Sequence, residues 1–343
     1  MLRRFCALGI IVTIGACLLL AGSVGSAPEA MAKPGLRGTF LQLSAAHGDW
    51  PPEKWAQLFD YFRQLKLTRL IVQWSVYDDL AFFPTKNFGQ VNRPPLETIL
   101  KLADGAHMEV LVGLAYDSQF WARIEREPKL VEIYLRRLRL RSQEAAEAVL
   151  PLAQAHPSFR GWYLPEEVDD VNWQKREARR VLVEHLRDLG QFLRRLTPTA
   201  RLALSGFADG RTDPQTLGHL WRELLAEAPL DLVLFQDGIG AQKLSLEDLP
   251  LYLTAVRQAA VSPGRHFQVV VELFQQVSAQ PFKARPAPWP RLERQLALAS
   301  KYSDTGAVGF SVPEYLTPWG GPAAARLSEA YLGWLKSDAN RNN

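Results

Sequence analysis

The chain is poor in cysteine: among its 343 residues it has two, Cys6 and Cys17, and both lie in its first apolar stretch. The rest of the chain therefore forms no disulfide bond, and its stability must come from a hydrophobic core. A strong excess of charge is also missing, because the formal net charge is only +4. This charge is too small to indicate a nucleic-acid-binding surface, so we expect no nucleic acid partner.

Motifs for metal, nucleotide and serine chemistry are missing as well. The six histidines are scattered, and none belongs to a spaced metal-binding motif. Gly238-Ile239-Gly240 lacks the third glycine and the basic residue of a phosphate-binding loop. Ser205-Gly206 lacks the flanking glycines of a hydrolase nucleophile elbow. We therefore expect neither a metal nor a cofactor, and a metal-dependent reaction such as deacetylation would require a bound divalent ion.

Residues 1–32 are typical of a targeting segment. Arg3 and Arg4 provide a positive start, an apolar run extends from Phe5 to about Ala21, and small residues follow. We expect a periplasmic or secreted protein, with cleavage between about residues 23 and 32 or with an uncleaved segment as a membrane anchor.

From residue 33 onward, short apolar runs alternate with stretches of helical periodicity, which is the pattern of a parallel sheet. Behind Pro51-Pro52, for example, Trp55, Leu58, Phe59 and Phe62 form one apolar stripe. The expected strands are 36–43, 68–75, 109–115, 159–166, 201–207, 231–237, 267–274 and 307–312. The helices after the first are expected near 95–106, 128–155, 173–196, 214–227, 246–260, 290–301 and 323–336.

Eight such units predict an α/β fold, the (β/α)8 or TIM barrel, because right-handed crossovers allow eight tilted parallel strands to close. A doubly wound open sheet is the alternative. No Pro-, Gly- or Ser-rich linker divides the chain, so we expect one domain over 33–337 and a polar tail at 338–343. The long segment 77–95 is expected to cover part of the upper face.

Carboxylates occur where such barrels have their active sites, at the C-terminal ends of the strands. Glu272 lies in the apolar run 269–274, where an unpaired charge is costly. A buried ion pair with a barrel Arg or Lys would be the alternative explanation. Glu166 and Glu167 end the fourth strand, and alternation directs at most one of them straight into the barrel mouth. The candidate catalytic residues are Glu166, Glu167 and Glu272.

Carboxylates that end strands four and seven face each other across the mouth of a barrel, an arrangement suited to cleaving a glycosidic bond. One carboxyl group donates a proton to the leaving oxygen, and the other attacks or activates water. The placement favours a retaining glycoside hydrolase by analogy. Sugar-binding grooves also need aromatic platforms and polar hydrogen-bonding groups. The candidate substrate-binding residues are Gln42, His47, Trp50, Gln73, Trp74, Tyr116, Tyr163, Ser205, Gln236, Asp237, Glu314 and Tyr315.

The strand ends also resemble those of a known family. The motifs are Gly38-Thr39-Phe40-Leu41-Gln42, Trp50, Trp55, Ile71-Val72-Gln73-Trp74, Gly161-Trp162-Tyr163 with Glu167, Gln236-Asp237-Gly238-Ile239-Gly240, and Glu272-Leu273-Phe274. Over about residues 36 to 316 they resemble the domain of unknown function 4434 family, a barrel group similar to glycoside hydrolases. The resemblance implies the barrel, a carbohydrate-directed site, and equivalent roles for Glu167 and Glu272. It favours Glu167 as acid/base, because many members have a non-acidic residue in place of Glu166.

Two functions remain open from the sequence. The first is an exported hydrolase or transglycosylase that acts on an oligo- or polysaccharide, with Glu167 as proton donor and Glu272 as nucleophile. The second is a catalytically silent saccharide-binding barrel that serves polysaccharide export or assembly. Binding without turnover would favour the second.

Overall fold

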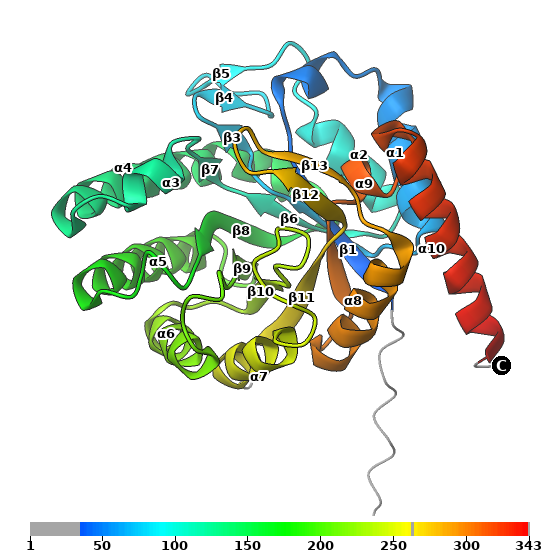
Figure 1. The fold of residues 1–343 in the computed structure, drawn as a ribbon. Coiled ribbons are helices and arrows are strands. Elements are labelled where there is room, and N and C mark those ends of the chain that lie inside the picture. Colours follow the sequence, from blue (N-terminus) through cyan, green and yellow to red (C-terminus); the bar gives the residue numbers. More distant parts are fainter. Residues whose placement is uncertain (1–34, 262–263, 342–343) are drawn as a thin grey trace, which may run out of the picture. The chain divides into compact units, whose positions relative to one another are not determined.

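Eight parallel strands form a closed barrel in the computed structural model, which describes residues 35–261 and 264–341. The order around the barrel is β1-β14-β11-β10-β9-β8-β6-β2, which confirms the predicted TIM barrel (Figure 1). The expected targeting segment, 1–32, lies outside the described residues. The barrel strands are β1 (Leu36–Leu41), β2 (Arg69–Val72), β6 (Glu109–Gly113), β8 (Phe159–Val168), β9 (Arg201–Gly206), β10 (Leu232–Gln236), β11 (His266–Glu272) and β14 (Ala307–Phe310).

Helices follow the barrel strands and pack on the outside of the barrel, as the apolar stripes predict (Figure 1). The longer ones are α1 (Pro52–Gln64), α2 (Leu96–Gly105), α4 (Pro128–Ala153), α5 (Arg176–Leu196), α6 (Pro214–Glu227), α7 (Leu249–Ala260), α8 (Trp289–Tyr302) and α10 (Pro322–Arg341). The short ones are η1 (Ala45–Asp49), α3 (Phe120–Ile124), α9 (Val312–Tyr315) and η2 (Pro318–Gly320). Helix α10 thus extends into the segment 338–343 that we expected as a polar tail. None of the helices within the described ranges is long and apolar enough to cross a membrane.

Two apolar layers hold the barrel together. The larger layer fills the space between the strands and the helices. The smaller one lies inside the barrel, where each strand contributes the side chains that alternate toward its axis. Its members are Phe40, Ile71, Leu111, Tyr163, Ala203, Leu232, Leu234, Val270 and Val308. Because side chains alternate along a strand, residues an even number of positions further on point into the barrel mouth.

Two small sheets extend beyond the C-terminal ends of the barrel strands. A four-stranded sheet, in the order β5-β4-β3-β7, is built mostly from the segment after β2. An antiparallel hairpin of β12 and β13 follows β11. Most of these strands have only two residues, which is too short for a visible alternation in the sequence, and we did not predict them. Their bounds are β3 (Val76–Tyr77), β4 (Leu80–Ala81), β5 (Gly89–Gln90), β7 (Ala115–Tyr116), β12 (Phe274–Ser278) and β13 (Lys283–Pro286).

A charged network connects the N-terminal ends of several barrel strands. Arg69 of β2 donates to Glu109 of β6 at 2.7 Å and also to the side-chain oxygen of Gln268 in β11. Arg201 of β9 contacts the same carboxylate at 3.2 Å. Burial opposes ionisation of Glu109, but the Arg69 and Arg201 guanidiniums outweigh it and hold the pKa of Glu109 below its ordinary value. The network therefore links four strands at this end of the barrel.

Replacing Arg69 by leucine should destabilise the barrel, because Gln268 loses its donor and the partly buried Glu109 carboxylate loses the closer of its two guanidinium partners and keeps only Arg201. We expect the free energy of unfolding in urea to fall by about 2–3 kcal/mol. Arg63→Leu is the matched control: its pair with Asp60 is exposed on α1, so the loss should stay below about 0.5 kcal/mol. Equal losses in the two variants would contradict a supporting role for the network.

Candidate active site

A cavity of about 660 Å³ opens at the C-terminal ends of the barrel strands, within the size range of ligand sites. It brings together seven of the residues predicted from the sequence: Gln42, Gln73, Trp74, Tyr116, Glu167, Gln236 and Glu272. Five of them lie two or four residues after a residue of the inner apolar layer on the same strand, so they also point inward: Gln42, Gln73, Glu167, Gln236 and Glu272.

Glu167 reaches the cavity from the end of β8. It lies four residues beyond Tyr163, whose side chain is inside the barrel, so both point inward. The amide of Gln236 donates a hydrogen bond of 2.5 Å to Oε1 of Glu167. Burial raises the pKa of Glu167 above its ordinary value, and the Gln236 hydrogen bond and the Lys243 charge offset only part of this shift.

Glu166 points in the opposite direction and does not line the cavity. Its side chain is buried toward the helices, where Oε1 lies 3.1 Å from Nε2 of His185 on α5. The other ring nitrogen of His185 lies 3.1 Å from the carbonyl oxygen of Leu135 and therefore carries a hydrogen. The alternation along β8 thus separates the two adjacent glutamates, and Glu166 contacts a helix instead of the cavity.

Glu272 is buried at the end of β11 and lines the same cavity. Its Oε2 accepts a hydrogen bond of 2.7 Å from the backbone N–H of Ala241, in the loop after β10. Burial and the nearby Asp237 carboxylate raise the pKa of Glu272, and the backbone donors and Lys243 oppose this shift. Among the residues that the structure describes, no arginine or lysine forms an ion pair with Glu272. A buried ion pair therefore does not explain why this carboxylate lies in an apolar strand.

Gly240 allows the loop after β10 to approach Glu272 this closely. A Cβ at this position would lie 2.4 Å from the carbonyl oxygen of Phe274 and 2.8 Å from the Cβ of Glu272. Since real Cβ contacts are not this short, any larger residue would displace the loop and the Ala241 donor.

Asp237 lies behind Glu272 instead of in the cavity. As the residue after the inward-pointing Gln236, it faces α8, where Gln295 donates to its Oδ2 at 2.6 Å. It also accepts a hydrogen bond of 3.1 Å from the backbone N–H of Ile239. Burial raises the pKa of Asp237, although these donors and Arg291 oppose the shift. Asp237 therefore contacts α8 and the backbone of Glu272 and of the loop after β10, and it does not line the cavity.

Aromatic side chains form one wall of the cavity. Trp74 stacks on Tyr116 with ring centroids 5.1 Å apart, and Tyr77 lies 5.0 Å from Trp74. Trp121 of α3 and Phe207 after β9 pack together at 5.7 Å and line the same cavity. Such rings offer flat apolar surfaces, which suit the C–H faces of sugars.

Several polar residues of the cavity were not predicted from the sequence. Lys243 is the most central, because its ammonium group pairs with Asp209 at 2.8 Å and lies 3.4 Å from the centre of the Phe207 ring. It follows β10 by seven residues, and a turn in which Lys243 donates to the Gly238 carbonyl returns it to the cavity. The other polar lining residues that we did not predict are Glu125, Asp169, Asn172, Asp209, Arg211 and Gln276. All of them belong to loops or short elements, where no periodicity indicates direction.

The remaining predicted substrate-binding residues lie outside the cavity lining. Tyr163 and Ser205 are buried beneath it and form a hydrogen bond of 2.7 Å with each other. His47 and Trp50 pack together at 4.5 Å in the loop after β1, where burial lowers the pKa of His47 to about 4.

Glu314 and Tyr315 follow β14 but turn away in the short helix α9. Ser311 donates to the Glu314 carboxylate, and Tyr315 packs against Phe274 at 5.5 Å. These two residues therefore support the edge of the site, whereas Phe274 and Phe310 contribute to its lining. Over the described part of the chain, no group of three or more His, Cys, Asp or Glu side chains is arranged to hold a metal ion.

Glu272→Gln should change how stability depends on pH. A raised pKa means that the folded protein holds this proton more tightly than the unfolded chain. This contribution to stability is complete below the ordinary value of 4.5 and is lost as pH rises through the raised value. The difference in Tm, variant minus wild type, should therefore increase by several degrees between about pH 5 and about pH 8. A difference that stays constant would contradict the shift, and Glu293→Gln, at an exposed position of α8, should follow the wild type.

The chain is similar to known proteins in sequence and in fold. The chain is 28% identical over 271 residues to the uncharacterized protein YbcH of Escherichia coli K12, covering 77% of this chain and 86% of YbcH. Among solved structures, it resembles a Bacteroides thetaiotaomicron protein proposed to be an alpha-L-fucosidase, with a TM-score of 0.71, 19% identity, and coverage of 92% and 98% of the two chains. It also resembles the endo-1,4-beta-mannanase of Rhizomucor miehei, with a TM-score of 0.55, 13% identity, and coverage of 89% and 95%.

At these identities the two solved structures show the fold alone, and that fold is the TIM barrel. Residues 36–324 match the sequence family described as Domain of unknown function (DUF4434), and this match spans all eight barrel strands. The chain therefore belongs to the DUF4434 family.

Proposed function

We propose that the protein is an exported glycoside hydrolase, or a transglycosylase, that cleaves O-glycosidic bonds of a polysaccharide. The observation that carries this proposal is the cavity at the C-terminal end of the barrel, which Glu167 and Glu272 both line. The glycoside hydrolase folds of the structural neighbours support it, and the N-terminal targeting pattern supports export.

Glu167 is the proton donor in this proposal. Its raised pKa keeps a larger fraction protonated toward neutral pH than for an ordinary glutamate. Because Gln236 donates to Oε1, the proton is held on Oε2, the oxygen that would face the glycosidic oxygen of the substrate. After the leaving group departs, the same carboxylate would remove a proton from the incoming water or sugar hydroxyl.

Glu272 is the nucleophile. The backbone N–H of Ala241 holds Oε2, which leaves Oε1 to attack the anomeric carbon. Because burial and Asp237 raise the pKa of Glu272 to about 8, Glu272 must first lose its proton, and Lys243 favours this ionised form. The resulting ester of Glu272 is then released by water or by a second sugar, so the anomeric configuration is retained. The Asp237 carboxylate opposes ionisation of Glu272, so the two carboxyl groups do not lose their protons independently of each other.

The sugar ring would lie against the aromatic wall of Trp74 and Tyr116. Gln73 is a candidate for binding a hydroxyl group of this sugar, because its buried Oε1 accepts no hydrogen bond from the described residues. A substrate hydroxyl that donates to this atom would satisfy it, and an unsatisfied buried acceptor is costly. Gln42 lines the same side of the cavity through β1, next to β2.

Glu167→Gln and Glu272→Gln should each lower kcat by about 10²-fold or more, because each removes one half of the carboxylate pair. The measurement is reducing-end release from a panel of purified glycans, followed by NMR to identify the first anomer formed. Glu166→Gln is the matched control, since its side chain faces α5, and circular dichroism verifies its folding. An inverted first product would contradict the nucleophile role of Glu272, and glycan binding without turnover in the wild type would favour the silent binding barrel.

A further inference from the structure

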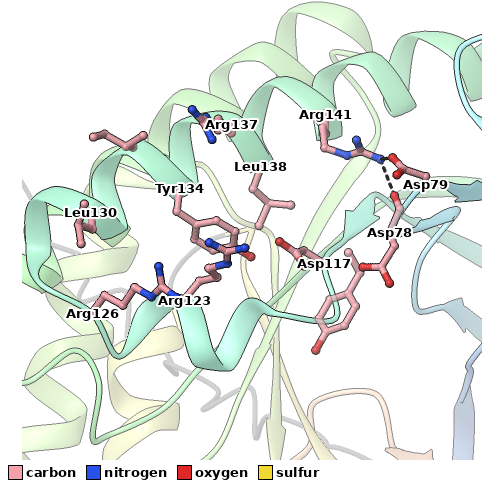
Figure 2. A pocket seen from close by; sticks show the side chains of 12 residues that line it. Asp78, Asp79, Asp117, Arg123, Arg126, Leu130, Tyr134, Arg137, Leu138 and Arg141 are labelled. Atoms are coloured by element: carbon pink, nitrogen blue, oxygen red, sulfur yellow. Dashed lines mark hydrogen bonds and ion pairs between the residues drawn. The ribbon is translucent and has the colours of Figure 1, made fainter.

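A second pocket, of about 440 Å³, lies beside the cavity between α3, the first half of α4 and the loop after β3. Figure 2 shows that the labelled side chains of α4 and of the α3 region surround it. On α4 the pocket residues Leu130, Tyr134, Arg137 and Arg141 follow one another at intervals of three or four, so they share one face of the helix. The mechanism proposed above uses none of these four residues.

The charges of this pocket are divided between two sides. On one side Asp79 pairs with Arg141 at 2.8 Å, and the Asp78 and Asp117 carboxylates accept backbone N–H groups of Ser118 and Gln119, each at 2.8 Å. On the other side are Arg123, Arg126 and Arg137. Within 35–261 and 264–341, no carboxylate forms an ion pair with these three guanidiniums. Asp79 is thus paired with a cation, Asp78 and Asp117 keep their charge on the acidic side, and the three arginines of the basic side are available to a ligand.

The pocket also has surfaces that suit an organic ligand. Leu130 and Ile133 line it with exposed fractions of 51% and 47%, which is high for large apolar residues. The hydroxyl group of Tyr134 is buried there, and burial together with the adjacent Asp117 carboxylate, to which it can donate a hydrogen bond, raises the pKa of Tyr134. Figure 2 shows the Tyr134 ring in the centre of the labelled group. A ligand with an apolar face and an anionic group would fit both the exposed leucine and isoleucine and the arginines.

The pocket adjoins the cavity that contains Glu167 and Glu272. Tyr116 lines both, and α3 separates them: Trp121 lines the cavity, whereas Arg123 lines the pocket. A chain of sugars in the cavity that crosses the Tyr116 ring would therefore reach the three arginines.

Resting on the proposed function, we infer that this pocket is a subsite for an acidic sugar, so that the substrate is an anionic polysaccharide. The planar guanidinium forks of Arg123, Arg126 and Arg137 match the geometry of carboxylate and of sulfate or phosphate groups. Other basic side chains of α4 do not share this arrangement. Arg139 pairs with Asp188 at 2.9 Å, and Arg136 is exposed outside the pocket.

Isothermal titration calorimetry with the purified protein tests this inference. The probes are polygalacturonate for carboxylates, dextran sulfate for sulfates, and uncharged dextran. We expect at least one acidic polymer to bind while dextran does not, and the preferred polymer identifies the anionic group. Arg123→Gln/Arg137→Gln should weaken this binding by about tenfold or more.

Arg136→Gln/Arg180→Gln is the matched control, because it removes the same charge from exposed positions of α4 and α5 outside both cavities. The affinity for the acidic polymer should stay within about twofold of the wild-type value, because salt screens charges at exposed surface sites and removing two of them changes binding little. Equal weakening in the two double variants, or no binding of either acidic polymer, would overturn the subsite.

The same proteins separate this inference from the proposed function. If a neutral glycan is cleaved but no acidic polymer binds, the subsite fails and the hydrolase stands. If an acidic polymer binds through the arginines but no glycan is turned over, the subsite stands and the hydrolase fails.

Discussion

The alternation of side chains along eight closed strands is the constraint on which the site depends. Inside the barrel the alternation builds an apolar layer from residues such as Tyr163, Leu234 and Val270. An even number of positions further along, the same strands present Glu167, Gln236 and Glu272 to the cavity. A shift of one residue would exchange Glu167 for Glu166, which here is buried against His185.

The second determinant is the burial of acids that have no full counter-charge. Glu272 and Asp237 lie close together and both are buried, so each raises the cost of ionising the other. The Ala241 amide, Gln295 and Lys243 reduce this cost without removing it. A fold retains such an arrangement at the expense of stability, and perturbed carboxyl groups in a cavity are typical of catalytic sites.

The sequence predicted the barrel well because each strand is a short apolar run followed by an amphipathic helix. It also predicted Glu272, since a charge within such a run is unusual. Counting alternate positions separates Glu167 from Glu166 only once Tyr163 is known to point inward, which the structure shows and the sequence does not. Counting does not extend into loops, which is why Lys243 was not predicted and why His47 and Tyr315 were expected to reach the cavity. Their directions depend on turns and packing that leave no period in the sequence.

In the proposed function, the cavity and the neighbouring arginine pocket bind successive parts of one long glycan. One region carries the acids and aromatic rings, and the other carries Arg123, Arg126 and Arg137. The central claim is that Glu167 and Glu272 act on one sugar from opposite sides. Its most direct test is the separation of their carboxyl oxygens in a crystal with a bound oligosaccharide. We predict about 5 to 5.5 Å with the anomeric carbon between them, whereas a separation beyond about 10 Å would contradict the mechanism.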